Sequence, residues 1–215
     1  MTDFAALRAQ MVERQLRRRD ISDERVLAAM EAVPREEFVG DSYRLRAYAD
    51  SALPIGEAQT ISQPWIVAAI AQALELRGEE LVLEVGTGSG YSAAVLARLA
   101  PHVVSIERHA ALAAEARDTL DRLGVRGVEV VVGDGSRGLP ERAPFDAIAV
   151  HAVAPAPPRS LLGQLADGGR LVLPLAAREA DVLTAFRRHG EELSSEAIGP
   201  CRFVPLIGEE GFAAG

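Results

Sequence analysis

The stretch LVLEVGTGSGY, residues 81–91, is the part of the sequence that says most about the fold. Its first five residues form a short apolar run that is typical of a buried strand, and a helical pattern begins at Tyr91. Between the two stand Gly86, Gly88 and Gly90, where a chain can turn sharply and bring backbone N–H groups close to a ligand. The pattern predicts a strand, a tight turn and a helix at a nucleotide-binding edge, although such turns also occur without a ligand.

The same alternation continues toward the C-terminus. Short apolar runs lie at 102–107, 128–132, 145–150 and 169–175, with helical patterns at 109–123 and around 160–165. Strands that alternate with helices imply a parallel sheet covered by helices on both faces. Two last runs, 181–190 and 202–208, have no helix between them, so we predict that they pair as an antiparallel hairpin at the sheet edge.

The N-terminal part of the chain is mainly helical. Residues 3–18 place apolar side chains on one helical face, and Ser22 is the predicted cap of a second helix that stops at Pro34. Residues 39–62 show no sustained period, and Pro64 suits the first turn of a helix. We therefore expect a single domain over 1–215. A helical extension and substrate-side loop occupy 1–62, and an α/β core with the C-terminal hairpin occupies 63–215.

Composition restricts the function. The net charge of −8 argues against nucleic-acid binding. We also expect no membrane association, because no apolar run reaches the length of a membrane span and the charged N-terminus lacks a signal-peptide core. Cys201 is the only cysteine, which suits the reducing cytoplasm. All 23 basic residues are arginine, so a Schiff-base lysine and a P-loop lysine are excluded.

Acidic residues at three strand ends indicate which nucleotide the glycine turn holds. A dinucleotide fingerprint needs glycine or alanine where Tyr91 stands, and a carboxylate at Glu84 would repel its pyrophosphate. Glu84 suits a cationic ligand such as the ammonium of a methionine moiety. Glu107 can accept both ribose hydroxyls, and Asp134-Gly135 can meet an adenine edge. Each acid alone could be a cap or loop residue, but together they favour S-adenosylmethionine over NAD or ATP.

The stretch LPIGEAQTISQPWIV, residues 53–67, suggests how an acceptor is held. We expect no metal site, because the histidines lack ligand spacing. His151 could act as a base, although a lone histidine at a strand end is more often simply hydrogen-bonded or exposed. A carboxylate acceptor needs no base, since it is ionised at neutral pH and requires only positioning. Neutral hydroxyls suit it better than a fixed cation, and Thr60 and Ser62 supply them, unless they only cap the helix at Pro64.

Segments along nearly the whole chain resemble one known family. They are RDISDERVLAAMEAVPREEFV, LPIGEAQTISQPWIVA, VLEVGTGSGY, VVSIER, GDG, APFDAIAV, QLADGGRLVLP and RFVPL. Together they are similar to the protein-L-isoaspartate O-methyltransferases. The resemblance implies a Rossmann-like class I methyltransferase fold with a mostly parallel seven-stranded sheet and an antiparallel edge hairpin.

The resemblance also implies an activity. It is methyl transfer from S-adenosyl-L-methionine, with S-adenosyl-L-homocysteine as product, to the free α-carboxylate of L-isoaspartyl residues in damaged proteins and peptides. D-Aspartyl residues are a second candidate substrate. The methyl ester then closes to a succinimide, which partly opens to aspartate. We further expect a monomer.

By motif match the resemblance assigns site residues. Ser62 is the family's active-site serine, and we place Thr60 beside it as the second catalytic hydroxyl. The expected cofactor-binding residues are Gln59, Ile61, Glu84, Gly86, Thr87, Gly88, Glu107, Arg108, Asp134 and Gly135. The expected substrate contacts are Ile55, Phe203, Val204 and Pro205. The chain departs from the family pattern at Glu57-Ala58 and at His151, which puts the peptide preference in doubt.

Three alternatives stay open. One is a related carboxyl methyltransferase that serves a single modified peptide. An NAD-linked oxidoreductase is the second, and Tyr91 and Glu84 count against it. The third is a non-catalytic S-adenosylmethionine-binding module, against which the intact segment around Thr60 and Ser62 argues.

Overall fold

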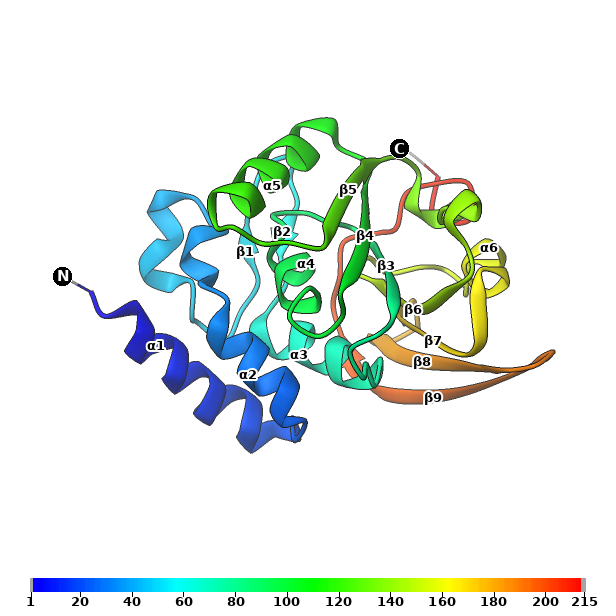
Figure 1. The fold of residues 1–215 in the computed structure, drawn as a ribbon, viewed down its shortest axis with the longest axis horizontal. Coiled ribbons are helices and arrows are strands. Elements are labelled where there is room, and N and C mark those ends of the chain that lie inside the picture. The colour runs from blue at the N-terminus through cyan, green and yellow to red at the C-terminus, as the bar shows by residue number, and fades with distance from the viewer. Residues whose placement is uncertain (1, 214–215) are drawn as a thin grey trace.

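A seven-stranded sheet forms the centre of the computed structural model, which describes residues 2–213 (Figure 1). The strands are β3 (Leu81–Val85), β4 (His102–Glu107), β5 (Val128–Val132), β6 (Phe145–Val150), β7 (Leu165–Leu175), β8 (Asp181–His189) and β9 (Glu192–Cys201). Their order in space is β5-β4-β3-β6-β7-β8-β9. Pairing is parallel from β5 to β7 and antiparallel for β7–β8 and β8–β9. The mostly parallel sheet with an antiparallel edge hairpin is confirmed.

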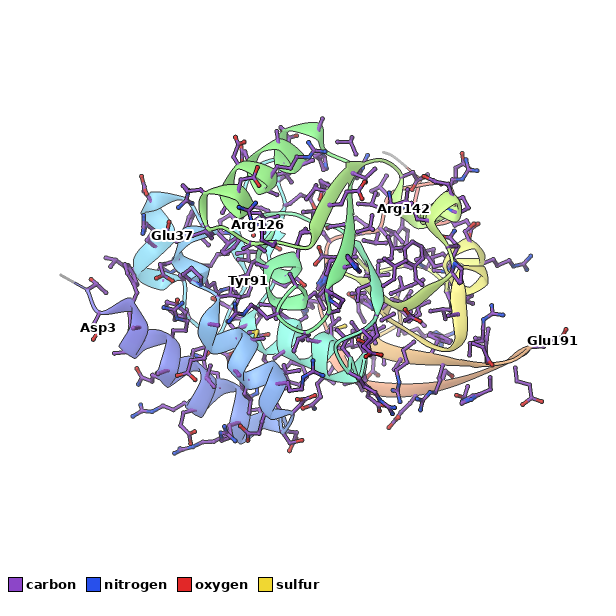
Figure 2. All side chains as sticks on the ribbon, viewed as in Figure 1. Asp3, Glu37, Tyr91, Arg126, Arg142 and Glu191 are labelled. Atoms are coloured by element: carbon purple, nitrogen blue, oxygen red, sulfur yellow. The ribbon has the colours of Figure 1, made fainter. Side chains whose placement is uncertain are left out.

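The outer strand of that hairpin is not the one that the sequence predicts. β9 is polar and mostly exposed, whereas residues 202–208 hold only two isolated bridges, from Pro205 to Val153 and from Ile207 to Phe212. An edge strand with both faces in water carries no alternating apolar pattern that would reveal it. Phe203 and Leu206 are apolar for another reason, since they pack against the two hydrophobic cores. The β8–β9 hairpin extends away from the body of the protein, with Glu191 at its tip (Figures 1 and 2).

Helices cover both faces of the sheet, as the alternation predicts. They are α1 (Phe4–Met11), α2 (Glu24–Ala32), α3 (Pro64–Ala73), α4 (Tyr91–Leu96), α5 (Ala110–Arg122) and α6 (Arg159–Gly163). One core joins Val82 and Val103 to residues of the first five helices, and the other joins Leu83 and Val104 to Leu161 of α6. Fully burying one such aliphatic side chain stabilises the fold by about 1.5–3 kcal/mol. Successive strand residues thus point into opposite cores.

Several helix ends differ from their predicted positions, among them that of α1, which ends at Met11, and two of the differences have a clear cause. The cap of α2 is Asp23 rather than Ser22, because the Asp23 carboxylate accepts hydrogen bonds from the N–H groups of Arg25 and Val26. A carboxylate at this place is also favoured by the positive end of the helix dipole. α6 ends at Gly163, since Leu165 already pairs with Phe145 as the first residue of β7.

The segment predicted to be irregular, residues 39–62, contains a 3₁₀ turn at Asp41–Arg46 and a small hairpin. The hairpin joins β1 (Leu53–Pro54) to β2 (Thr60–Ile61). The hairpin places the predicted catalytic segment directly before α3, close to the carboxyl ends of the parallel strands. No helix between residues 2 and 213 is both long and apolar enough to cross a bilayer.

Candidate active site

The candidate site is a cleft at the carboxyl ends of the parallel strands. β3 has β4 on one side and β6 on the other, so the chain reverses its direction of travel across the sheet at this point. Open α/β sheets bind ligands at such a switch point. A cleft of about 780 Å³ lies there. It brings together twelve predicted site residues: Gln59, Thr60, Ile61, Ser62, Gly86, Thr87, Gly88, Glu107, Arg108, Gly135, Val204 and Pro205.

The glycine turn is tied to β4 rather than open to a phosphate. Gly86 and Gly88 have φ of 94° and 52°, in a region of backbone conformation that residues other than glycine rarely adopt. The Gly86 N–H donates to the carbonyl of Ile106 at 2.8 Å, and the Gly88 N–H donates to Glu107 Oε2 at 2.9 Å. A pyrophosphate would need these N–H groups for itself. The turn therefore disfavours a dinucleotide and leaves the buried Glu107 carboxylate at the cleft wall.

Glu84 lies one layer beneath the cleft instead of lining it. Its side chain is fully buried, and its Oε2 accepts a hydrogen bond from Ser105, whose hydroxyl also bonds the cleft-lining Thr87. Glu84 Oε1 makes no hydrogen bond and lies 3.3 Å from Nε2 of His151. A buried carboxylate with an unsatisfied oxygen makes the neighbouring cleft favourable for a cation. Glu84 thus fits a cationic cofactor, but its charge acts on the cleft from a distance rather than by direct contact.

Asp134 also stands outside the cleft lining, while its neighbour Gly135 lines it. The Asp134 carboxylate accepts hydrogen bonds from the N–H and hydroxyl of Ser136 and from the N–H of Glu209. Partial burial acts in the opposite direction, but these hydrogen bonds hold the pKa of Asp134 below its usual range. Asp134 therefore fixes the shape of the loop that presents Gly135 and fastens it to the C-terminal segment.

The β1–β2 hairpin packs over the glycine turn. A Cβ at Gly88 would lie 3.4 Å from Ile55 Cδ1, so Ile55 contacts the turn, and it does not line the cleft. At the hairpin tip, Glu57 and Ala58 have φ of 56° and 53°. The Glu57 carboxylate lies 3.5 Å from Nδ1 of His109, a residue of the cleft. The structure thus places this departure from the family pattern beside the cofactor cleft.

The hydroxyls of Thr60 and Ser62 are free for a ligand. The residue before α3 is Gln63, and no side chain caps this helix. No hydrogen bond within residues 2–213 uses either hydroxyl, and neither oxygen is sealed from solvent. The alternative in which these residues serve as helix caps is therefore not what the structure shows.

Sequence reasoning missed Arg35, which positions Ser62. Arg35 is fully buried, and its guanidinium donates to the carbonyls of Ser62 and Ala47, each at 2.7 Å. It lies 4.8 Å from the ring centre of Tyr91, a residue in the interior of the protein (Figure 2). Desolvation lowers the pKa of Arg35 to about 10. Its sequence context, among other charged residues, gives no signal that distinguishes it from an exposed arginine.

A second cavity adjoins the cleft. Its empty volume, which includes space open to solvent, is about 1050 Å³. It is lined in part by Phe203, Arg19 and Arg202, with no aspartate or glutamate in its lining. Four residues line both cavities: Thr60, Ser62, His151 and Val204. Arg19 is already paired with Asp50, its Nη1 lying 2.8 Å from Oδ2, so Arg202 is the cation that suits this space to an anionic ligand. A donor in the cleft and an acceptor in the second cavity would meet at these four residues.

The sheet order, the switch-point cleft and the acid at the end of β4 define a class I S-adenosylmethionine-dependent methyltransferase. Comparison with known proteins narrows this class. The model of the protein-L-isoaspartate(D-aspartate) O-methyltransferase family matches residues 7–211, and the chain belongs to this family.

Relatives and solved structures agree with this assignment. Two relatives, both called protein-L-isoaspartate O-methyltransferase, come from Koribacter versatilis and Methanoculleus marisnigri. The first is 51% identical over 99% of this chain and 96% of its own, and the second is 53% identical over 95% and 93%. A solved protein-L-isoaspartate O-methyltransferase superposes with a TM-score of 0.85 at 32% identity, covering 95% of this chain and 67% of that chain.

One further solved structure supports the fold. It is a Plasmodium falciparum protein of the same description, in complex with S-adenosyl-L-homocysteine. It superposes with a TM-score of 0.81 at 24% identity and covers 93% of this chain and 98% of that chain.

Proposed function

We propose that this protein transfers a methyl group from S-adenosyl-L-methionine to the free α-carboxylate of L-isoaspartyl residues in damaged proteins and peptides. Family membership supports the reaction. The observation that carries the assignment to this site is the position of Thr60 and Ser62. Both residues line both cavities, and their hydroxyls make no hydrogen bond within the described part of the chain.

We propose that the cleft residues hold the cofactor, which supplies an electrophilic methyl group when bound. Glu107 offers carboxylate oxygens at the end of β4, where a ribose is expected. Glu84 contributes negative potential from beneath, and Asp134 acts by shaping the loop at Gly135. The remaining proposed contacts are Gln59, Ile61, Gly86, Thr87, Gly88 and Arg108, all of which line the cleft. Ile55 supports this side of the site by packing on the glycine turn.

The acceptor carboxylate is proposed to lie where the cavities meet. It is ionised at neutral pH, so the protein has to orient it rather than remove a proton. Thr60 and Ser62 are neutral donors, which can orient an oxygen without neutralising the charge that the reaction consumes. Phe203, Val204 and Pro205 are proposed contacts for the flanking peptide. Arg202 edges the second cavity, where it would attract an anionic acceptor.

The product of this reaction is a methyl ester. Its carbonyl carbon can be attacked by the backbone nitrogen of the following residue with loss of methanol, whereas a carboxylate would have to expel oxide. Closure to a succinimide and its opening then return part of the isoaspartate to aspartate, so repair is the proposed outcome. We also propose that the protein works as a monomer in the cytoplasm. The single cysteine supports a reducing compartment, since it leaves no partner for an intramolecular disulfide. Cys201 is also buried, which raises the pKa of its thiol to about 11 and makes it unreactive.

A paired-peptide assay tests the proposal. Labelled methyl groups from S-adenosyl-L-methionine should enter an isoaspartyl peptide, and the aspartyl peptide of the same sequence should stay unlabelled. A D-aspartyl peptide as a third arm measures the second candidate substrate. Equal labelling of the isoaspartyl and aspartyl peptides would refute the proposed specificity. The Ser194→Ala variant, changed at an exposed position of β9, is the control and should label the isoaspartyl peptide as the wild type does.

A further inference from the structure

His151 occupies the junction of the two cavities. It follows β6, and its backbone N–H donates to the carbonyl of Val85 at 2.8 Å, which fixes the residue against β3. Of the four residues that line both cavities, His151 alone carries a ring with two different nitrogen atoms. The methyl transfer proposed above gives this ring no proton to remove, because the acceptor is already ionised.

One nitrogen of the ring is anchored in the core. Nε2 lies 2.8 Å from the hydroxyl of Ser92 on α4 and 3.3 Å from Oε1 of Glu84 at the end of β3. A carboxylate oxygen 3.3 Å from Nε2 favours a hydrogen on that nitrogen. Glu84 and Ser92 therefore act as positioning residues, which set both the direction of the ring and its hydrogen.

The other nitrogen is available to a ligand. Nδ1 makes no hydrogen bond to any of residues 2–213, and it is not among the buried polar atoms that lack a partner, so solvent reaches it. In the tautomer that carries its single hydrogen on Nε2, Nδ1 has a lone pair and can only accept a hydrogen bond. The ligand group that it suits is an N–H donor beside the reacting carboxylate, and a peptide backbone supplies such a donor.

We propose that His151 determines specificity for the acceptor. In this proposal Nδ1 accepts a hydrogen bond from a backbone N–H of the substrate peptide next to the isoaspartyl residue. This inference rests on the proposed function. It assigns to Glu84 the task of orienting His151, in addition to its electrostatic effect on the cleft.

Two amide substitutions separate the roles of the two ring nitrogens. His151→Gln extends far enough to keep a polar contact with Ser92 or Glu84 but places no acceptor at the position of Nδ1. His151→Asn places its amide oxygen near the position of Nδ1 but is too short to contact Ser92 and Glu84 as Nε2 does. We expect His151→Gln to raise KM for the isoaspartyl peptide about fivefold, the size of one neutral hydrogen bond, with kcat changed less than twofold. His151→Asn should keep KM closer to that of the wild type and lower the melting temperature, because it leaves Glu84 without its neighbour.

The dissociation constant of S-adenosyl-L-homocysteine, measured by calorimetry, completes the test. It should be unchanged in His151→Gln, since the lost group faces the acceptor. His189→Gln, at the exposed end of β8, is the matched control and should match the wild type in every readout. A peptide KM for His151→Gln within twofold of the wild type would overturn the inference, as would a loss of cofactor affinity as large as the change in KM.

Assay of the wild-type protein separates a failure of the role proposed for His151 from a failure of the proposed function. Methylation of the isoaspartyl peptide by the wild type, with an unaltered KM in His151→Gln, refutes the role of His151 and leaves the proposed function standing. A wild-type protein that does not methylate the isoaspartyl peptide refutes both.

Discussion

Replacement of Arg35 by methionine should lower both stability and turnover. The side chain is fully buried, and it donates to the carbonyls of Ala47 and Ser62 while it lies against the ring of Tyr91. Methionine has a similar reach and fills much of the same space. It removes both hydrogen-bond donors and the charge, so the effect of these interactions can be measured without a large cavity.

The expected size follows from three contributions. Each buried carbonyl left without a donor costs about 2 kcal/mol, and the contact with the Tyr91 ring is worth about 2 kcal/mol in a desolvated place. In the opposite direction, the shift of the Arg35 pKa from 12.5 to about 10 corresponds to about 3 kcal/mol of penalty for the buried charge, which methionine relieves. The net loss in the free energy of unfolding is therefore about 3 kcal/mol.

Urea unfolding and steady-state kinetics would check this prediction. Turnover of the isoaspartyl peptide should fall about tenfold or more, because the Ser62 backbone loses its support and small displacements of reacting groups are costly. Arg35→Lys keeps the charge but cannot stack as a plane or reach both carbonyls equally, so we expect an intermediate result. Arg18→Met, at an exposed arginine, is the control.

Two results would contradict the reasoning. An unchanged unfolding free energy in Arg35→Met would mean that the three contacts contribute no net stability. A loss of stability with full turnover would mean that Arg35 supports the fold without positioning Ser62.

Three further predictions concern single side chains. Ser62→Ala should lower kcat at least tenfold and leave the affinity for S-adenosyl-L-homocysteine unchanged, whereas full activity would exclude a catalytic hydroxyl. Glu107→Gln should weaken that affinity about tenfold or more by calorimetry, because the carboxylate holds the turn and faces the cleft. A hydrogen bond from Arg122, with help from Arg44, keeps the pKa of Glu37 low. Its stabilisation is thus present above the usual glutamate pKa and is lost as pH falls through the lowered value. Glu37→Gln should therefore lower the free energy of unfolding, measured in urea at pH 7, by about 1 kcal/mol. In strong acid its free energy of unfolding should equal that of the wild type.

The core of the fold could be predicted because its signals are local. Short apolar runs, the spacing between them and the glycines at 86, 88 and 90 depend on backbone conformation and on burial of neighbouring residues. These signals predicted the parallel strands, both helical layers and the position of Glu107 at the cleft. Strand β9 gave no such signal, since its first six side chains, residues 192–197, are all exposed and show no alternation of buried and exposed positions.

The partners of buried polar groups were decided by the tertiary structure alone. Glu84 shares a face of β3 with Val82, and that face is covered by helices, so its carboxylate turns toward Ser105 and His151 rather than into the cleft. Arg35 reaches Ser62 across 27 positions of sequence. Burial and hydrogen-bond partners of this kind arise from contacts between distant segments. Local sequence patterns were therefore enough to predict the class of fold and the acids and hydroxyls available for catalysis, whereas packing between distant segments sets which of these groups meet at the cleft.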